Sequence, residues 1–236
     1  PERGRVVKEG PASPGQYREK LSNLAKLIAG FDLVGLQEIG GEEEAQDLAE
    51  ASGMLYLFSQ GRDTYTGQDV AFLIRGGCGW DVTAHGRLRE LDIFSKHIYV
   101  ALRDGSGRRL VAVNVHCIRP IGESKEKHAA QLAALRAFAA EGPRRYPGAF
   151  FVIMGDFNDD ETAEGEYMGP GYVEANEQLS WPATHLSGKG FDRIFARGAE
   201  PSGTELRKPP YGRKPNDALK MEWTDHFLLG TRLIFP

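Results

Sequence analysis

Residues 149–158 read AFFVIMGDFN, and this stretch decides the fold more than any other part of the chain. The run from Ala149 to Met154 is continuously apolar, which predicts a strand buried on both faces of a sheet. Asp156 and Asn158 follow at alternate positions, so both side chains are expected on the same side of the extended chain. The stretch therefore predicts a core strand that delivers a carboxylate and an amide to the rim of its sheet.

Four further motifs place acidic or histidine side chains at the beginning or end of apolar runs. They are Glu38 in LQE, His116 in VNVH, Asp192 in GFDRI, and Asp225 and His226 in TDH. Carboxylates bind hard divalent cations, and imidazoles accept and donate protons near neutral pH. Gathered at one rim, these groups suit the hydrolysis of a phosphate ester.

Apolar periodicity predicts more strands than helices, with the two types alternating along the chain. Helices are expected at residues 17–29, 42–51 and 123–140, and strands at residues 31–36, 54–58, 70–74, 80–84, 98–102, 110–115, 149–154, 191–196 and 226–229. This pattern favours a four-layer α/β sandwich, in which two packed mixed β-sheets have helices outside. The sandwich is expected to form one domain that spans residues 1–236. Residues 86–95, 157–190 and 198–223 lack periodicity and are expected to form functional loops.

The composition is that of a globular protein, with 41% hydrophobic and 26% charged residues. A net charge of -4 gives no overall attraction to nucleic acid or anionic lipid, although a local basic rim is compatible with it. No apolar stretch approaches the ~18 residues of a membrane span, and the N-terminal PERGR is not a signal peptide, which leaves the compartment open. Two reduced thiols at Cys78 and Cys117 are favoured over a disulfide.

The order of the motifs resembles the endonuclease/exonuclease/phosphatase superfamily, the group of deoxyribonuclease I, exonuclease III-type repair enzymes and sphingomyelinases. The resemblance covers roughly residues 17–236 and implies a two-sheet α/β sandwich of the deoxyribonuclease I type. The FDRI around Asp192 resembles the YDRI of deoxyribonuclease I, and Thr184 lies where that subfamily has a threonine. One feature departs from the pattern: nothing before Tyr17 matches the usual N-terminal strand and its Asn.

The resemblance also implies a divalent metal ion. Glu38 is expected to be its main ligand, and Asp225 is expected to lie beside it. Mg²⁺ keeps several waters and needs only one or two carboxylates, so Mg²⁺ or Mn²⁺ is the expected cofactor, with Ca²⁺ as an alternative. A strand-end Glu in a salt bridge is the competing interpretation of Glu38.

The same resemblance assigns catalytic roles. Asp156 is expected to position or deprotonate the attacking water, and Asn158 to donate a hydrogen bond to the phosphoryl oxygen. A turn at Asp156–Asn158 is the competing interpretation. His226 is expected to contact the scissile phosphate, with Asp192 orienting its ring.

His116 is expected to act as a second imidazole, either as an acid or as a donor to the phosphate. Its partner is sought at Gln68 or Asp69, near the start of the strand at residues 70–74. The remaining histidines have no motif around them and are interpreted as surface or packing residues; they are His85, His97, His128 and His185.

The candidates for contact with substrate are Thr184, Arg207, Arg213 and Lys214. The last three belong to a locally basic stretch, for which a solvated surface loop is the equal alternative. The sequence thus predicts a monomeric, metal-dependent nuclease with DNA as its partner. The alternatives are a phosphatase, a sphingomyelinase-like phospholipid phosphodiesterase, and a catalytically decayed binding module.

Overall fold

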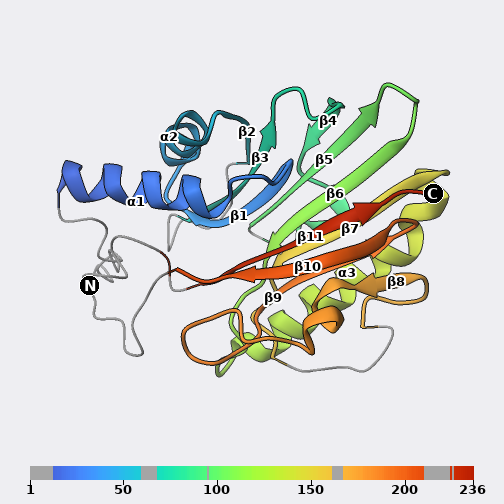
Figure 1. Ribbon diagram of the computed structural model, residues 1–236. Coiled ribbons are helices and arrows are strands. Elements are labelled where there is room, and N and C mark those ends of the chain that lie inside the picture. Colours follow the sequence, from blue (N-terminus) through green and yellow to red (C-terminus); the bar gives the residue numbers. More distant parts are fainter. Residues whose placement is uncertain (1–12, 60–67, 95, 161–166, 210–223, 225) are drawn as a thin grey trace.

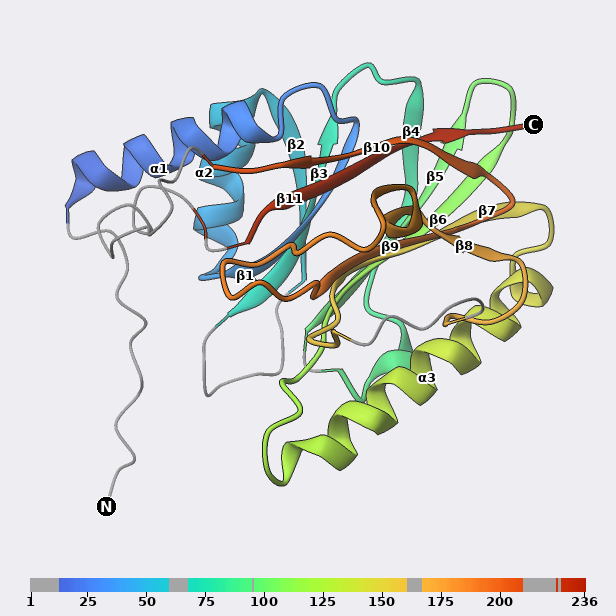
Figure 2. The same cartoon turned by 60° about the horizontal axis from the view of Figure 1, so that its bottom comes forward.

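The computed structural model describes residues 13–59, 68–94, 96–160, 167–209, 224 and 226–236. Its elements lie in four layers, with two sheet layers in the middle and helices outside them, as predicted (Figures 1 and 2). In chain order they are α1 (Pro14–Leu27), β1 (Leu33–Ile39), α2 (Glu42–Ser52), β2 (Met54–Ser59), β3 (Asp69–Arg75), β4 (Trp80–Gly86), η1 (Arg89–Leu91), β5 (His97–Asp104), β6 (Arg109–His116), α3 (Ser124–Arg145), β7 (Ala149–Asp156), β8 (Tyr172–Glu174), η2 (Ala175–Leu179), β9 (Asp192–Arg197), β10 (Glu200–Arg207) and β11 (Leu228–Ile234).

One layer is a six-stranded sheet in the order β4-β5-β6-β7-β9-β8. Among the described strands of this sheet only β6 and β7 run parallel, and α3 is the crossover helix that such a parallel connection requires. The apolar side of α3 covers the outer face of this sheet, where Leu135 and Phe138 pack with Ile153 and Phe195. The predicted buried strand at 149–154 is therefore the central strand β7.

The other layer contains the antiparallel sheet β1-β3-β2, covered on its outer face by α1 and α2. Leu21 of α1 and Leu48 of α2 pack there with Leu73 of β3. The inner face carries Phe72, which packs against Val100 and other apolar residues of the six-stranded sheet. Because β3 is covered on both faces, its sequence is a continuous apolar run rather than an alternating one.

The antiparallel pair β10–β11 extends the same layer, and β10 corrects the prediction of irregular structure for residues 200–207 of the segment 198–223. The register of the pair shifts between Ser202 and Glu205, where Gly203 has φ 59°. Gly203 at the bulge and Pro201 are residue types that usually interrupt strands, so the sequence pattern did not indicate β10. The partner strand β11 begins at Leu228 and is longer than the predicted 226–229.

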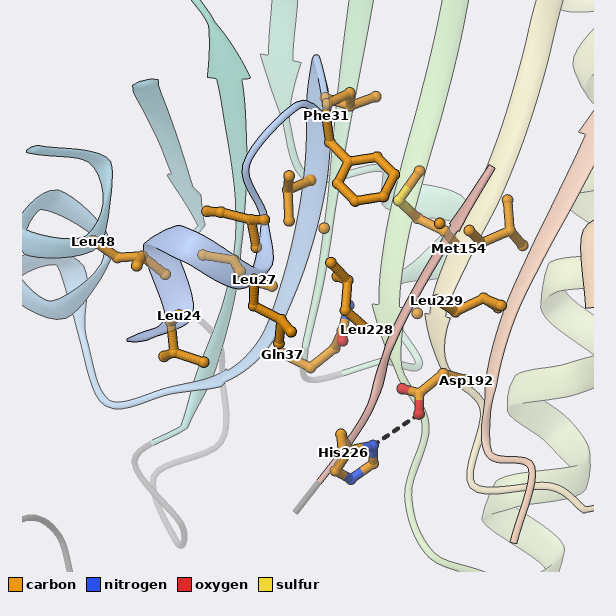
Figure 3. A pocket seen from close by; sticks show the side chains of 18 of the residues that line it. Leu24, Leu27, Phe31, Gln37, Leu48, Met154, Asp192, His226, Leu228 and Leu229 are labelled. Carbon is orange, nitrogen blue, oxygen red and sulfur yellow. Dashed lines mark hydrogen bonds and ion pairs between the residues drawn. The ribbon is translucent and has the colours of Figure 1, made fainter. Parts of the chain in front are cut away.

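A groove of 1910 Å³ separates β1 from β11 (Figure 3). Within the described residues both strands are edge strands, since β1 pairs only with β3 and β11 only with β10. Side-chain packing connects the two sides of the groove, and the Phe31 ring lies over Gly230 so closely that a Cβ there would be 2.2 Å from the ring. The expectation about the N-terminal strand falls largely on residues 1–12, which lie outside the described residues.

Two minor expectations can be compared with the described residues. Cys78 and Cys117 are free thiols, which confirms the interpretation of two reduced cysteines. Among the helices of the described ranges, none combines the length and apolar character needed to cross a bilayer.

Candidate active site

Three neighbouring strands bring a carboxylate or an imidazole to one rim of the six-stranded sheet. His116 ends β6, Asp156 ends β7, and the two residues are register partners in the parallel pair. Asp192 begins β9 and is the register partner of Asp156 in the antiparallel pair. The sheet register therefore places three of the predicted site residues side by side.

The chain turns sharply after Asp156. Asn158 has φ 48°, its backbone N–H donates to Asp156 Oδ1 at 2.7 Å, and its side-chain Nδ2 donates to Asp156 Oδ2 at 3.1 Å and to the Cys117 carbonyl at 2.9 Å. Both side chains are buried. The strand-end and turn interpretations of the sequence are thus both realised, and Asn158 holds the Asp156 carboxylate in place. Donation by Asn158 to a phosphoryl oxygen stays a prediction.

Gly155 permits the close approach of β6 and β7 just before this turn. Its φ is 139°, and a Cβ at this position would lie 1.9 Å from the Val115 carbonyl oxygen. No other residue fits between the strands here, because the conformation is one that only glycine adopts readily and the added atom would overlap the backbone.

His226 lies against Asp192, the residue expected to orient its ring. The distance from His226 Nδ1 to Asp192 Oδ2 is 2.8 Å, and Figure 3 shows the pair at the end of the groove. In the tautomer with its hydrogen on Nδ1, the ring donates to this carboxylate. Thr184 stabilises this arrangement: its Oγ1 accepts from the Asp192 N–H at 2.9 Å, and its carbonyl accepts from the Phe227 N–H at 2.6 Å.

The sequence interpretation missed His185, which packs directly on His226. The two residues form an isolated antiparallel β-bridge, and their ring centroids are 4.8 Å apart at an interplanar angle of 69°. The Nδ1 of His185 accepts from the Ser187 backbone N–H at 2.9 Å, which fixes the ring. No local motif marks His185, because the contact depends on a bridge between distant segments.

His116 lies beside Asp156, with 3.5 Å between His116 Nε2 and Asp156 Oδ2. Both side chains are buried. Gln68 accepts a hydrogen bond from Lys96 Nζ at 3.3 Å. The pairing of His116 with Gln68 or Asp69 stays a prediction, whereas its proximity to Asp156 is a feature of the sheet register.

Glu38 is the penultimate residue of β1 on the opposite sheet layer and adds a further carboxylate. Its backbone φ is 59°, within a register shift between Leu36 and Ile39. Burial raises the pKa of Asp156 to about 7, helped by the negative charges of Asp192 and Glu38 and opposed by His226 and the Asn158 N–H. The structure therefore concentrates negative charge between the two sheet layers at this end of the groove.

Comparison with known families agrees with this geometry. The family model described as Endonuclease/Exonuclease/phosphatase family matches residues 7–226. The chain belongs to the Endonuclease/Exonuclease/phosphatase family. No curated protein sequence matches the chain directly.

Solved structures of several proteins share the fold of this family member. A truncated TDP2 from Caenorhabditis elegans is 15% identical with a TM-score of 0.69, and the match covers 94% of this chain and 92% of that one. A mannosyl-6-phosphatase from Bacteroides thetaiotaomicron VPI-5482 is 16% identical with a TM-score of 0.70, covering 98% and 97%. The human Nocturnin catalytic domain, with bound sulfate, is 17% identical with a TM-score of 0.66, covering 98% and 92%. At these identities the likeness establishes the fold.

The donor set of this family member fits a hard divalent cation. Glu38, Asp156 and Asp192 supply carboxylate oxygens, and the charges of Asp192 and Glu38 add to the burial that raises the pKa of Asp156. A bound cation would offset these negative charges. Within the described residues no group of three or more acidic, histidine or cysteine side chains is arranged to hold a metal ion.

The predicted substrate contacts are placed differently. Thr184 is fully buried and holds Asp192, as described above. The guanidinium of Arg207 donates to the Leu27 and Ala29 carbonyls at the end of α1 and pairs with Glu205. Both residues thus stabilise the fold, and their contact with a substrate stays a prediction. Three other predicted residues lie outside the described residues: Asp225, Arg213 and Lys214.

Proposed function

We propose that the chain is a divalent-metal-dependent hydrolase that cleaves phosphodiester bonds of DNA. The observation that carries the proposal is the convergence of the buried carboxylate Asp156 with the Asp192–His226 pair at one rim of the sheet. Buried acids beside an oriented imidazole are expensive to maintain and are typical of sites where protons move.

Asp156 is suited to accept the proton of an attacking water. Burial raises its pKa above the ordinary value of a carboxyl group, which makes the carboxylate a stronger proton acceptor. The hydrogen bonds from Asn158 keep the carboxylate oriented, and His116 lies 3.5 Å away as a second group able to hold a proton. The oxygen of the deprotonated water would then attack phosphorus.

His226 is suited to contact the phosphoryl group. Asp192 accepts from Nδ1, and the protonated ring would donate from Nε2 to an oxygen that gains charge in the transition state. The divalent cation, held by Glu38 with help from the neighbouring carboxylates, would supply further charge neutralisation at the phosphoryl oxygens. Both groups therefore favour the transition state over the ground state.

DNA is the proposed substrate because one structure of this fold, TDP2 from D. rerio, is a complex with a single-strand DNA product. That protein is 19% identical, with a TM-score of 0.67 and coverage of 90% of each chain. The likeness to a mannosyl-6-phosphatase favours a phosphomonoester as the second candidate. The groups around Asp156 serve either reaction, so the choice depends on the surrounding loops.

The deciding experiment is nicking of supercoiled plasmid in Mg²⁺ or Mn²⁺ against EDTA, with wild type beside His226→Ala and the control Asp81→Asn, which changes an exposed carboxylate on β4. We expect metal-dependent nicking that is lost in His226→Ala and kept in the control. Phosphate release from mannose 6-phosphate and hydrolysis of sphingomyelin vesicles are assayed in parallel. Activity on either without nicking would replace the DNA proposal, and DNA binding without any hydrolysis would identify a binding module.

A further inference from the structure

The carboxamide of Asn114 bridges the two sheet layers directly below the candidate site. Asn114 lies on β6 two positions before His116 and has no exposed surface. Its Nδ2 donates to the Leu36 carbonyl of β1 at 2.9 Å and to the Ala71 carbonyl of β3 at 3.0 Å. A residue of the six-stranded sheet thus forms hydrogen bonds with two strands of the opposite layer.

The two carbonyls belong to residues that are register partners in the β1–β3 pair. They form the last regular pair before the register shift, and pairing resumes only at Ile39 with Asp69. Gln37 and Glu38 lie within this bulge, opposite a single residue of β3. Asn114 therefore fixes the point at which β1 leaves the regular ladder.

The third hydrogen bond of Asn114 reaches into the bulge itself, because its Oδ1 accepts from Gln37 Nε2 at 2.5 Å. The carboxamide fits below β1 only because Gly35 has no side chain: a Cβ there would lie 3.0 Å from Asn114 Cγ and 2.9 Å from Met154 Sδ. Both the close approach and the hydrogen bonds are thus specific to this position.

The bulge determines the direction of the Glu38 side chain. Its φ of 59° is unfavourable for a residue other than glycine, so the surrounding contacts must maintain it. If β1 relaxed to regular pairing, the register would slip by one residue and the Glu38 side chain would move to the other face of the sheet. The hydrogen bonds of Asn114 oppose that relaxation.

We propose that Asn114 is a positioning residue that holds the Glu38 carboxylate toward the His116–Asp156 pair and thereby sets the affinity of the site for its divalent cation. This inference rests on the proposed function in one respect, that Glu38 binds the cation. Asn114 itself is buried and touches neither cation nor substrate.

The test is Mn²⁺ binding, followed by the electron paramagnetic resonance signal of the free ion, in wild type and Asn114→Leu. Leucine has a similar shape and no polar atoms. The matched control is Gln131→Leu on α3, since Gln131 is also a buried carboxamide that bonds two backbone groups, the Ile118 N–H and the Ile93 carbonyl. Urea unfolding establishes that each variant is folded.

We expect Asn114→Leu to bind Mn²⁺ about 10- to 100-fold more weakly, the range found when a group supporting a metal ligand is removed. Raising Mn²⁺ should restore nicking by Asn114→Leu toward the wild-type rate. Gln131→Leu should bind Mn²⁺ as wild type does. Wild-type affinity in a folded Asn114→Leu, or equal weakening in Gln131→Leu, would overturn the inference and leave the proposed function standing.

Two further outcomes are decisive. If Asn114→Leu does not fold, Gln37→Ala takes its place, because this half-buried side chain bonds Asn114 and its removal frees the bulge on one side. Its Mn²⁺ affinity should fall, and an unchanged value would overturn the inference. A wild-type protein that binds no Mn²⁺ would instead contradict the metal dependence in the proposed function, and the inference with it.

Discussion

Asp156 and Asp192 lie directly opposite each other on β7 and β9, and each has its own histidine. Asp192 Oδ2 is 2.8 Å from His226 Nδ1, and Asp156 Oδ2 is 3.5 Å from His116 Nε2. Two carboxylates in register but in different surroundings can divide the tasks of a hydrolytic site, one orienting an imidazole and the other exchanging a proton. The first two predictions separate these tasks.

Asp192→Asn should lower the rate of phosphoester hydrolysis by about 10² to 10⁴, the usual contribution of a positioned proton-transfer group. The amide cannot hold the His226 ring in the same way, because it offers a donor as well as an acceptor. Initial rates of plasmid nicking at saturating metal measure the effect, with Asp81→Asn as the exposed control. Equal rates for Asp192→Asn and Asp81→Asn would remove Asp192 from the site.

Asp156→Asn should abolish activity and stabilise the metal-free protein at pH 8. Burial raises the pKa of Asp156 from 3.8 to about 7, so the folded state holds a proton that the unfolded chain has released between these values. The free energy of unfolding therefore falls as pH rises through this window, and the asparagine variant avoids this loss. Urea unfolding in EDTA at pH 4 and pH 8 measures it, and a variant less stable than wild type at pH 8 would contradict the prediction.

His97 should contribute a pH dependence of the opposite sign. Burial, with the positive charge of Arg87, lowers its pKa from 6.5 to about 4, so the folded state keeps the ring neutral. As pH falls from 6.5 toward 4, the unfolded chain gains a proton that the folded chain does not, and stability is lost. The pH dependence of urea unfolding should be reduced in His97→Gln and unaltered in His85→Gln, where the ring is exposed.

Gly155→Ala should destabilise the fold severely, by more than about 4 kcal/mol or to the point of unfolding. The added Cβ would lie 1.9 Å from the Val115 carbonyl oxygen at a φ of 139°. Gly77→Ala is the matched control: its φ is 72° but nothing lies within 4 Å, so the cost is about 1–2 kcal/mol from the backbone alone. Thermal unfolding compares them, and similar losses for both would show that β6 and β7 can separate to accept a methyl group.

The elements of the fold that could be predicted from the sequence are those with a local hydrophobic pattern. The run at Ala149–Met154 identified the central strand, because a strand covered on both faces is apolar throughout. The strand β10 was missed, because Pro201 and Gly203 at its bulge mimic a loop. His185 and Asn114 were missed because their importance arises from contacts between distant segments, which no local motif records.

The groove between β1 and β11 has a consequence for where the folded protein opens locally. In an antiparallel pair every second residue directs its N–H away from its partner, so half of the amides of each edge strand face the groove. Within the described residues these amides have no strand to shield them, although they lie in the middle of a layer (Figure 2). Hydrogen–deuterium exchange should therefore be rapid along β1 and β11 and slow along β3, which is paired on both sides. The layer should open first at its centre rather than at its margins.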